Sequence, residues 1–139
     1  MEHSGGVTII PLLSPTEIVM VKQYRHAAGE ILLELPAGKL EEGEQPRECV
    51  QRELVEETGY SSASINKLFS FYTTPAYSSE LLHLYLGQDL EYKEKDPDPG
   101  EIITTEIINK KDIMSLVETG RIRDSKTIIG LLYILGKGL

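Results

Sequence analysis

Nine residues in the middle of the chain, RELVEETGY at positions 52–60, carry the strongest structural signal in the sequence. Pro46 lies a few residues before them, and proline suits the first turn of a helix because its missing N–H would have no partner there. Gly59 closes the segment, and glycine is the usual residue just past a helix C-terminus. The pattern therefore predicts a helix over residues 46–58.

On this helix Glu53, Glu56 and Glu57 share one sector of the surface, because residues three and four apart are neighbours. Like charges at this spacing repel each other. Most helical glutamates simply face water, so a solvated face is one interpretation of the three. The other is a cation among them, since carboxylates are the hard oxygen ligands that Mg²⁺ and Mn²⁺ prefer.

Composition narrows the class of protein. The chain has 139 residues, enough for one domain spanning residues 1–139, and its single cysteine excludes an internal disulfide and suits the cytoplasm. The sequence contains no apolar run of about 18 residues, so no membrane span is predicted. A net charge of −8 argues against nucleic acid as a partner, because backbone binding relies on lysine and arginine. A phosphate-bearing small molecule remains possible if divalent cations lie between the two sets of anions.

Apolar periodicity and turn residues predict a mixed sheet with helices packed on it. A hairpin turn at residues 14–16 is expected to join the first two strands. The expected strands are residues 7–13, 17–24, 31–35, 65–72, 81–86 and 102–108, and the expected helices are residues 46–58, 110–118 and 125–135.

A longer pattern includes the acidic segment. Residues 38–60 fit G-x5-E-x7-R-E-U-x-E-E-x-G-U, where U is a bulky apolar residue, at every fixed position. The fixed residues are Gly38, Glu44, Arg52, Glu53, Glu56, Glu57 and Gly59. This resembles the Nudix box. The resemblance implies an α/β Nudix fold, an α/β/α sandwich with a mixed sheet and a loop–helix–loop motif, in an enzyme that hydrolyses a diphosphate linked to another group.

The same resemblance implies roles for the box residues. Glu53 and Glu57 would be direct ligands of Mg²⁺ or Mn²⁺, with Glu56 ligating directly or through water. The backbone carbonyl of Ala37 would also face a metal. Arg52 would act in the catalytic group and, with Glu44, brace the loop against the helix.

Outside the box the chain resembles the ADP-ribose pyrophosphatase branch of the family. The resemblance rests on VKQYRHAAGEILLELPAGKLEEGE before the helix, on Pro75 and Glu80 after it, and on TGRIRDSKTIIGLL near the end. It implies a nucleoside diphosphate substrate, ADP-ribose, cleaved to AMP and ribose 5-phosphate. Other nucleoside diphosphate sugars, dinucleoside polyphosphates, nucleoside triphosphates and a noncatalytic nucleotide-sensing module remain alternatives.

Substrate-binding roles follow from this branch. Arg25 would contact the diphosphate, although a surface salt bridge is the plain alternative. Pro75 and Tyr77 would shape the pocket for adenosine or the terminal ribose, with Glu80 close by. Packing in the core or in a loop is the alternative for Pro75 and Tyr77.

In this branch a glutamate of a late loop commonly activates the water. Glu101 is the matching choice, ahead of Asp98 or a box glutamate, and a solvated turn is the alternative for each. Members of the branch usually carry an extra N-terminal region that exchanges between subunits. The resemblance therefore implies a homodimer, and this chain would be a short or truncated form.

Overall fold

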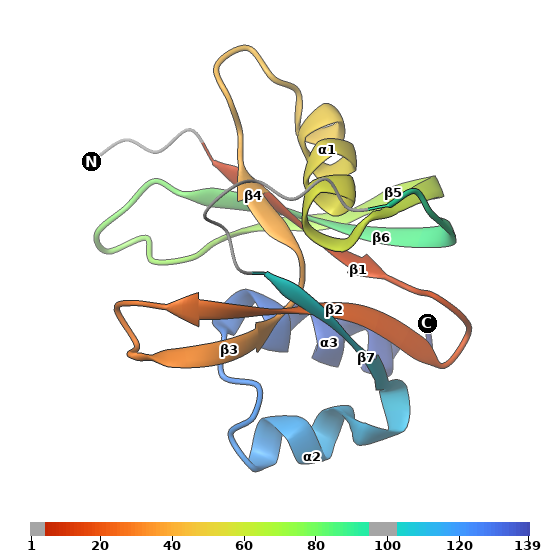
Figure 1. Ribbon diagram of the computed structural model, residues 1–139. Coiled ribbons are helices and arrows are strands. Elements are labelled where there is room, and N and C mark those ends of the chain that lie inside the picture. Colours follow the sequence, from red (N-terminus) through yellow and green to blue (C-terminus); the bar gives the residue numbers. More distant parts are fainter. Residues whose placement is uncertain (1–4, 95–102) are drawn as a thin grey trace.

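The computed structural model describes residues 5–94 and 103–139 (Figure 1). Its strands are β1 (Gly6–Pro11), β2 (Glu17–Arg25), β3 (Glu30–Glu34), β4 (Ala37–Lys39), β5 (Tyr60–Tyr72), β6 (Leu81–Tyr92) and β7 (Thr104–Asn109). Its helices are α1 (Pro46–Thr58), the 3₁₀ turn η1 (Lys110–Asp112), α2 (Ile113–Glu118) and α3 (Ser125–Lys137).

The strands form two sheets. The first has the order β4-β1-β6-β5 and is mixed, because β1 runs parallel to β6 while the pairs β1–β4 and β5–β6 are antiparallel. The second has the order β3-β2-β7 and is antiparallel throughout. The mixed sheet predicted from the sequence is thus confirmed, and a second sheet lies beside it.

The expected turn joins the first two strands, but these strands do not continue as a paired hairpin. The turn itself forms, since the Leu13 N–H donates to the Glu17 carbonyl at 2.9 Å and one isolated bridge joins Leu12 to Ile18. Beyond that bridge β1 and β2 enter different sheets. The physical reason is that β1 is buried along its whole length between β4 and β6, while β2 finds its partners in β3 and β7.

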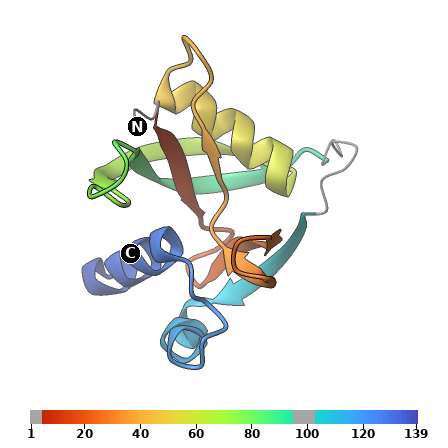
Figure 2. The same cartoon turned by 90° about the vertical axis from the view of Figure 1, so that its left-hand side faces the viewer.

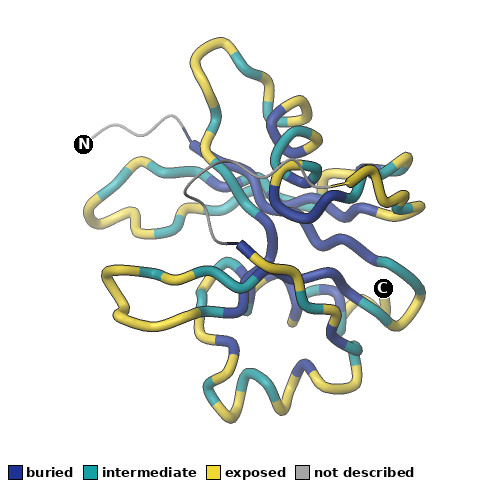
Figure 3. The backbone as a smooth tube through the Cα atoms, in the orientation of Figure 1, coloured by how far each residue is buried: buried dark blue, intermediate teal, exposed yellow. Residues whose placement is uncertain are grey.

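Helices cover the mixed sheet on both sides. In the turned view α1 lies on one side of the sheet and α3 on the other (Figure 2). Side chains of β1 alternate between two apolar clusters, as the period of a strand requires. Val7 and Ile9 pack with α1, whereas Ile10 and Leu12 pack with α2 and α3. The α/β/α arrangement expected from the resemblance is confirmed, and the buried backbone runs through its centre (Figure 3).

Strand β4 lies in a segment that the sequence indicated only as loop. It pairs with β1 in the register Thr8↔Ala37, Val7↔Gly38. The buried Thr8 hydroxyl also donates to the Pro36 carbonyl at 3.0 Å. These bonds hold the backbone that enters the glycine-rich loop firmly against the central strand.

Strands β5 and β6 extend further than predicted. They pair along their length from Tyr60↔Tyr92 to Tyr72↔Leu81, with one irregularity between Lys67 and Phe69. The start of β5 is rich in serine and lacks the apolar alternation by which a strand is recognised, so no sequence pattern predicted it. In the part of the chain described, no helix is both long and apolar enough to cross a membrane.

Candidate active site

Helix α1 presents its acids toward β4. It begins with Pro46 in its first turn and ends at Gly59, whose φ of 80° is left-handed, so both predicted ends are confirmed. Its buried face carries Cys49, Val50 and Leu54, which pack against β1, β5 and β6. This packing fixes the rotation of the helix and therefore decides where each glutamate lies.

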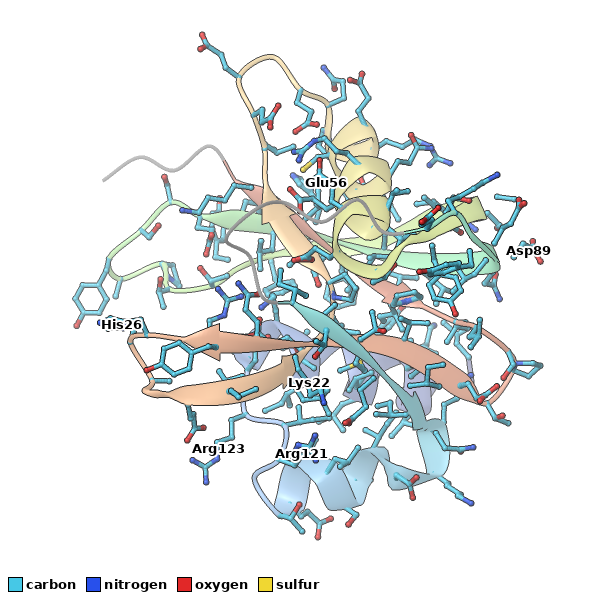
Figure 4. The ribbon with its side chains drawn as sticks, viewed as in Figure 1. Lys22, His26, Glu56, Asp89, Arg121 and Arg123 are labelled. Atoms are coloured by element: carbon cyan, nitrogen blue, oxygen red, sulfur yellow. The ribbon has the colours of Figure 1, made fainter. Side chains whose placement is uncertain are left out.

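The three glutamates differ in their surroundings. Glu57 is only 8% exposed, and its Oε1 accepts a hydrogen bond from the Ala37 backbone N–H at 2.8 Å. The Glu53 side chain is 15% exposed, and that of Glu56 is 52% exposed. Glu53 and Glu57 line one cleft, whereas the side chain of Glu56, labelled in Figure 4, is not part of that lining and pairs with Arg52 at 3.2 Å.

Gly38 lies directly against the side chain of Glu53. A Cβ at position 38 would be 2.1 Å from Glu53 Cδ and 2.4 Å from its Oε1. No side chain larger than a hydrogen fits there while Glu53 keeps its place. The first glycine of the box thus determines where the Glu53 carboxylate lies.

Arg52 joins the loop to the helix. Its guanidinium donates to both carboxylate oxygens of Glu44, at 2.9 and 3.0 Å, and to Glu53 and Glu56 at 2.9 and 3.2 Å. The hydrogen bonds from Arg52 lower the pKa of Glu44 to about 2. The bond to Glu44 in turn raises the pKa of Arg52. Both groups therefore stay charged at neutral pH, and the bracing predicted for Glu44 and Arg52 has the contacts it requires.

The cleft in front of these acids has a volume of about 610 Å³. One wall is formed by α1 and β4, and the opposite wall by the end of β2 and the N-terminus of α3. Glu53 and Glu57 of α1 thus share the cleft with Arg25 of β2 and Lys126 of α3. Residues lining the cleft are Gln23, Arg25, Ala37, Gly38, Lys39, Glu53, Glu57, Thr73, Thr74, Glu80, Leu82, Ile103, Asp124, Ser125 and Lys126.

Arg25 reaches the cleft while paired with a buried acid. Its Nε and Nη2 each donate to one oxygen of Glu34 at 2.7 Å. The hydrogen bonds to Glu34 raise the pKa of Arg25, so the guanidinium is permanently charged. The salt-bridge alternative considered for Arg25 therefore exists, but within the cleft, where the same guanidinium remains accessible to a ligand.

Of the other residues predicted to bind substrate, one lines the cleft and two do not. Glu80 lines the cleft and accepts a 2.6 Å hydrogen bond from the Thr73 hydroxyl. Pro75 and Tyr77 are not among the residues that line it, and Tyr77 is 86% exposed. The lining residues that the sequence did not suggest include Gln23, at an inconspicuous position in β2.

The donors in the cleft fit a divalent cation that is only partly held by protein. Among residues 5–94 and 103–139, no group of three or more His, Cys, Asp or Glu side chains is placed to hold a metal ion. Mg²⁺ typically takes one or two carboxylates and fills its remaining positions with water and substrate phosphates. Glu53 and Glu57 supply such carboxylates beside the Ala37 backbone, whereas Glu101 and Asp98, the choices for the general base, lie outside the described residues.

Comparison with known proteins identifies the family. The family model described as "NUDIX domain" matches residues 2–129. The chain is 35% identical over 136 residues to the ADP-ribose pyrophosphatase of Bacillus subtilis, and 38% identical over 136 residues to the methanol dehydrogenase activator of Bacillus methanolicus. It is 31% identical over 144 residues to a GDP-mannose pyrophosphatase of Escherichia coli. Each alignment covers 96% of this chain and 74% of the relative.

The fold also matches a solved structure. A protein described as "Crystal structure of ADP compounds hydrolase" superposes with a TM-score of 0.85 at 22% identity, over 96% of this chain and 74% of the other. At that identity the match concerns the fold alone.

Proposed function

This chain belongs to the Nudix family, as a pyrophosphohydrolase of the ADP-ribose pyrophosphatase branch, and we propose that it hydrolyses ADP-ribose to AMP and ribose 5-phosphate. The observation that carries the proposal is the distribution of charge in the cleft. Glu53 and Glu57 of α1 and the paired Arg25 of β2 all line this cleft. A diphosphate between them would meet a guanidinium directly and the carboxylates through divalent cations.

Each group then has a chemical task. A bound divalent cation would offset the phosphate charge and stabilise the charge that develops on the attacking and leaving oxygens. Glu53 and Glu57 would hold it, with Glu56 acting directly or through water and the Ala37 carbonyl as a further ligand. Mg²⁺ is the proposed metal and Mn²⁺ the alternative. Arg52 would keep Glu53 and Glu56 in place through the contacts described above.

The reaction itself is a displacement at phosphorus. The oxygen of a water molecule bonds to one phosphorus while the bond from that phosphorus to the bridging oxygen breaks. The leaving phosphate retains the bridging oxygen, and the water proton passes to a general base. We assign that base to Glu101, from the resemblance to the branch. Arg25 would bind the diphosphate and orient it for the attack.

The sugar end of the substrate is assigned to the β5–β6 connection. Glu80, held by Thr73, lies at the cleft and would accept hydrogen bonds from ribose hydroxyls. Pro75 and Tyr77 would contribute only at the outer end of the pocket, because neither lines the cleft itself. The exposed ring of Tyr77 suits stacking against a base.

A second candidate substrate has specific support. The GDP-mannose pyrophosphatase of Escherichia coli aligns with this chain over 144 residues at 31% identity, and the ADP-ribose pyrophosphatase of Bacillus subtilis aligns over 136 residues. A nucleoside diphosphate sugar carries the same diphosphate and would use the same acids and Arg25. The two substrates differ only at the groups beyond the phosphates.

A substrate panel tests the function. ADP-ribose, GDP-mannose, a dinucleoside polyphosphate and a nucleoside triphosphate are each incubated with Mg²⁺, Mn²⁺ or EDTA, and products are separated by ion-exchange chromatography. We expect AMP and ribose 5-phosphate in equal amounts with either metal, and neither in EDTA. A higher kcat/KM for GDP-mannose than for ADP-ribose would change the substrate assignment to GDP-mannose. If no diphosphate is hydrolysed with either metal, the proposed enzymatic activity is wrong.

We further propose that the chain functions as a cytoplasmic homodimer with residues 1–139 in one domain. The dimer is implied by the resemblance, and the single cysteine, Cys49, is buried as a free thiol, which suits a reducing compartment. Analytical ultracentrifugation gives the mass directly. A monomer at the concentration of the activity assay would contradict the dimer.

A further inference from the structure

Four charged side chains, which we call the charged cluster, come from β2, β3 and the start of α3: Arg25, Glu34, Asp124 and Lys126. Arg25, Asp124 and Lys126 line the cleft, and Glu34 is buried next to them. Lys126 Nζ donates to Glu34 Oε1 at 2.6 Å and to Asp124 Oδ2 at 2.8 Å. Glu34 also receives the two 2.7 Å bonds from Arg25. One carboxylate therefore connects the arginine of β2 with the lysine of α3.

Burial makes these bonds strong and their loss costly. The Glu34 side chain is 1% exposed and that of Lys126 is 11% exposed. A buried carboxylate is stable only when charged donors compensate it. The two basic and two acidic side chains balance in number within the charged cluster. Lys126 and the Thr127 hydroxyl lower the pKa of Asp124, and they outweigh burial, which alone would raise it.

Three separate elements hold the charged cluster in place. Asp124 caps the N-terminus of α3, where it accepts from the Thr127 N–H at 3.2 Å and from its hydroxyl at 2.6 Å. The Thr127 hydroxyl in turn accepts from the Leu35 N–H at 3.0 Å, just beyond β3. Lys126 is therefore fixed by the helix on which it stands, and Glu34 by the end of β3.

We propose that Lys126 is a positioning residue for the diphosphate, which acts by holding the Glu34 carboxylate in the orientation that presents Arg25 to the cleft. Arg25 uses Nε and Nη2 for Glu34, and the remainder of its guanidinium serves the ligand. Without Lys126, Glu34 loses one of three charged bonds and its carboxylate can rotate, and Arg25 rotates with it. This role rests on the proposed function, because Arg25 is taken to bind the diphosphate.

A direct contact of Lys126 with the phosphates is the competing explanation, since Lys126 also lines the cleft. The two explanations differ in their dependence on Glu34. A positioning residue that acts through Glu34 has nothing left to position once Glu34 is neutral. A direct contact retains its value whatever residue 34 is.

The test compares Lys126→Met and Glu34→Gln with the double variant E34Q/K126M. KM and kcat are measured with ADP-ribose, and the dissociation constant of ADP is measured by calorimetry with Mg²⁺. K126M should raise KM and the ADP dissociation constant about tenfold, with kcat within about threefold, as expected for lost binding common to ground and transition states. E34Q and E34Q/K126M should bind ADP equally.

Lys22→Met is the matched control, because Lys22 lies on β2, the strand of Arg25, and its ion pair with Glu106 is long, at 3.8 Å, and partly exposed. It should leave both constants unchanged. A further tenfold loss from E34Q to E34Q/K126M would overturn positioning, as would unchanged ADP binding in K126M. If K126M alone does not fold, E34Q/K126M still serves, because it removes one charge of each sign and so keeps the charged cluster balanced. Absence of ADP-ribose hydrolysis by the parent would refute the proposed function, while ADP binding would still decide the role of Lys126.

Discussion

Replacing Gly38 by alanine tests how the Glu53 carboxylate is placed. The backbone of Gly38 does not lie in the left-handed region, so alanine can adopt its conformation. The added methyl group would lie 2.1 Å from Glu53 Cδ. The substitution therefore acts on the Glu53 side chain and leaves the course of the backbone unchanged.

The size of the effect follows from that distance. Carbon atoms in contact normally lie about 3.5–4.0 Å apart, so the carboxylate must move by roughly 1.5 Å. A misplacement of about 1 Å in a catalytic group can cost about 10²-fold in rate. We therefore expect kcat to fall at least about 100-fold, which corresponds to about 2.7 kcal/mol in the activation free energy. The free energy of unfolding should fall by only about 1–3 kcal/mol, as is usual for an overpacked site.

Steady-state hydrolysis of ADP-ribose with saturating Mg²⁺, together with urea unfolding, measures both quantities. Gly136→Ala is the matched control, because a Cβ at this position of α3 would meet no atom within 4 Å. It should retain full activity and gain stability, since alanine favours a helix by about 0.5–1 kcal/mol over glycine. A G38A variant with kcat within twofold of the parent would refute the reasoning.

Three further predictions concern the acids and Arg52. Glu57→Gln should lower kcat about 10²-fold or more. The melting temperature should stay near that of the parent, because the amide oxygen of Gln can still accept from the Ala37 N–H. Unimpaired turnover would remove Glu57 from the metal site. The pKa of Glu44 lies at about 2 in the folded protein, against an ordinary value of 4.5, so its pairing with Arg52 stabilises the fold above pH 4.5 and is lost as the pH falls toward 2. Arg52→Met should therefore give a shallower loss of stability over that range in urea titrations, and an unchanged slope would contradict the pairing. Glu101→Gln should lower kcat by about 10²–10⁴-fold if Glu101 is the general base, and near-normal kcat would move that role elsewhere.

The helix at the centre of the site could be predicted because its signals are local. Pro46 and Gly59 mark its ends through backbone chemistry alone. The spacing also placed Glu53, Glu56 and Glu57 in one sector of its surface. It could not distinguish the buried Glu57 from the exposed Glu56, because their exposure depends on how the rest of the chain packs against the helix.

Features that depend on distant pairing were not visible in the sequence. Strand β4 has only three residues, two of them small, and forms because β1 offers it a free edge. The division of β1 and β2 between two sheets likewise depends on partners far along the chain.

The charged cluster was missed for the same reason, since Glu34 and Lys126 are 92 residues apart. One local signal did exist, because Glu34 lies among apolar residues in ILLELP. A carboxylate in a buried strand requires a cation, and the sequence alone does not say which one.

The most direct test of the central claim is a calorimetric titration of Mn²⁺ into the parent and into the double variant Glu53→Gln, Glu57→Gln, with ADP present. If these two carboxylates hold the cation, the variant should bind Mn²⁺ at least about tenfold more weakly while its circular dichroism spectrum is unchanged. Equal Mn²⁺ affinity in a folded variant would contradict the account.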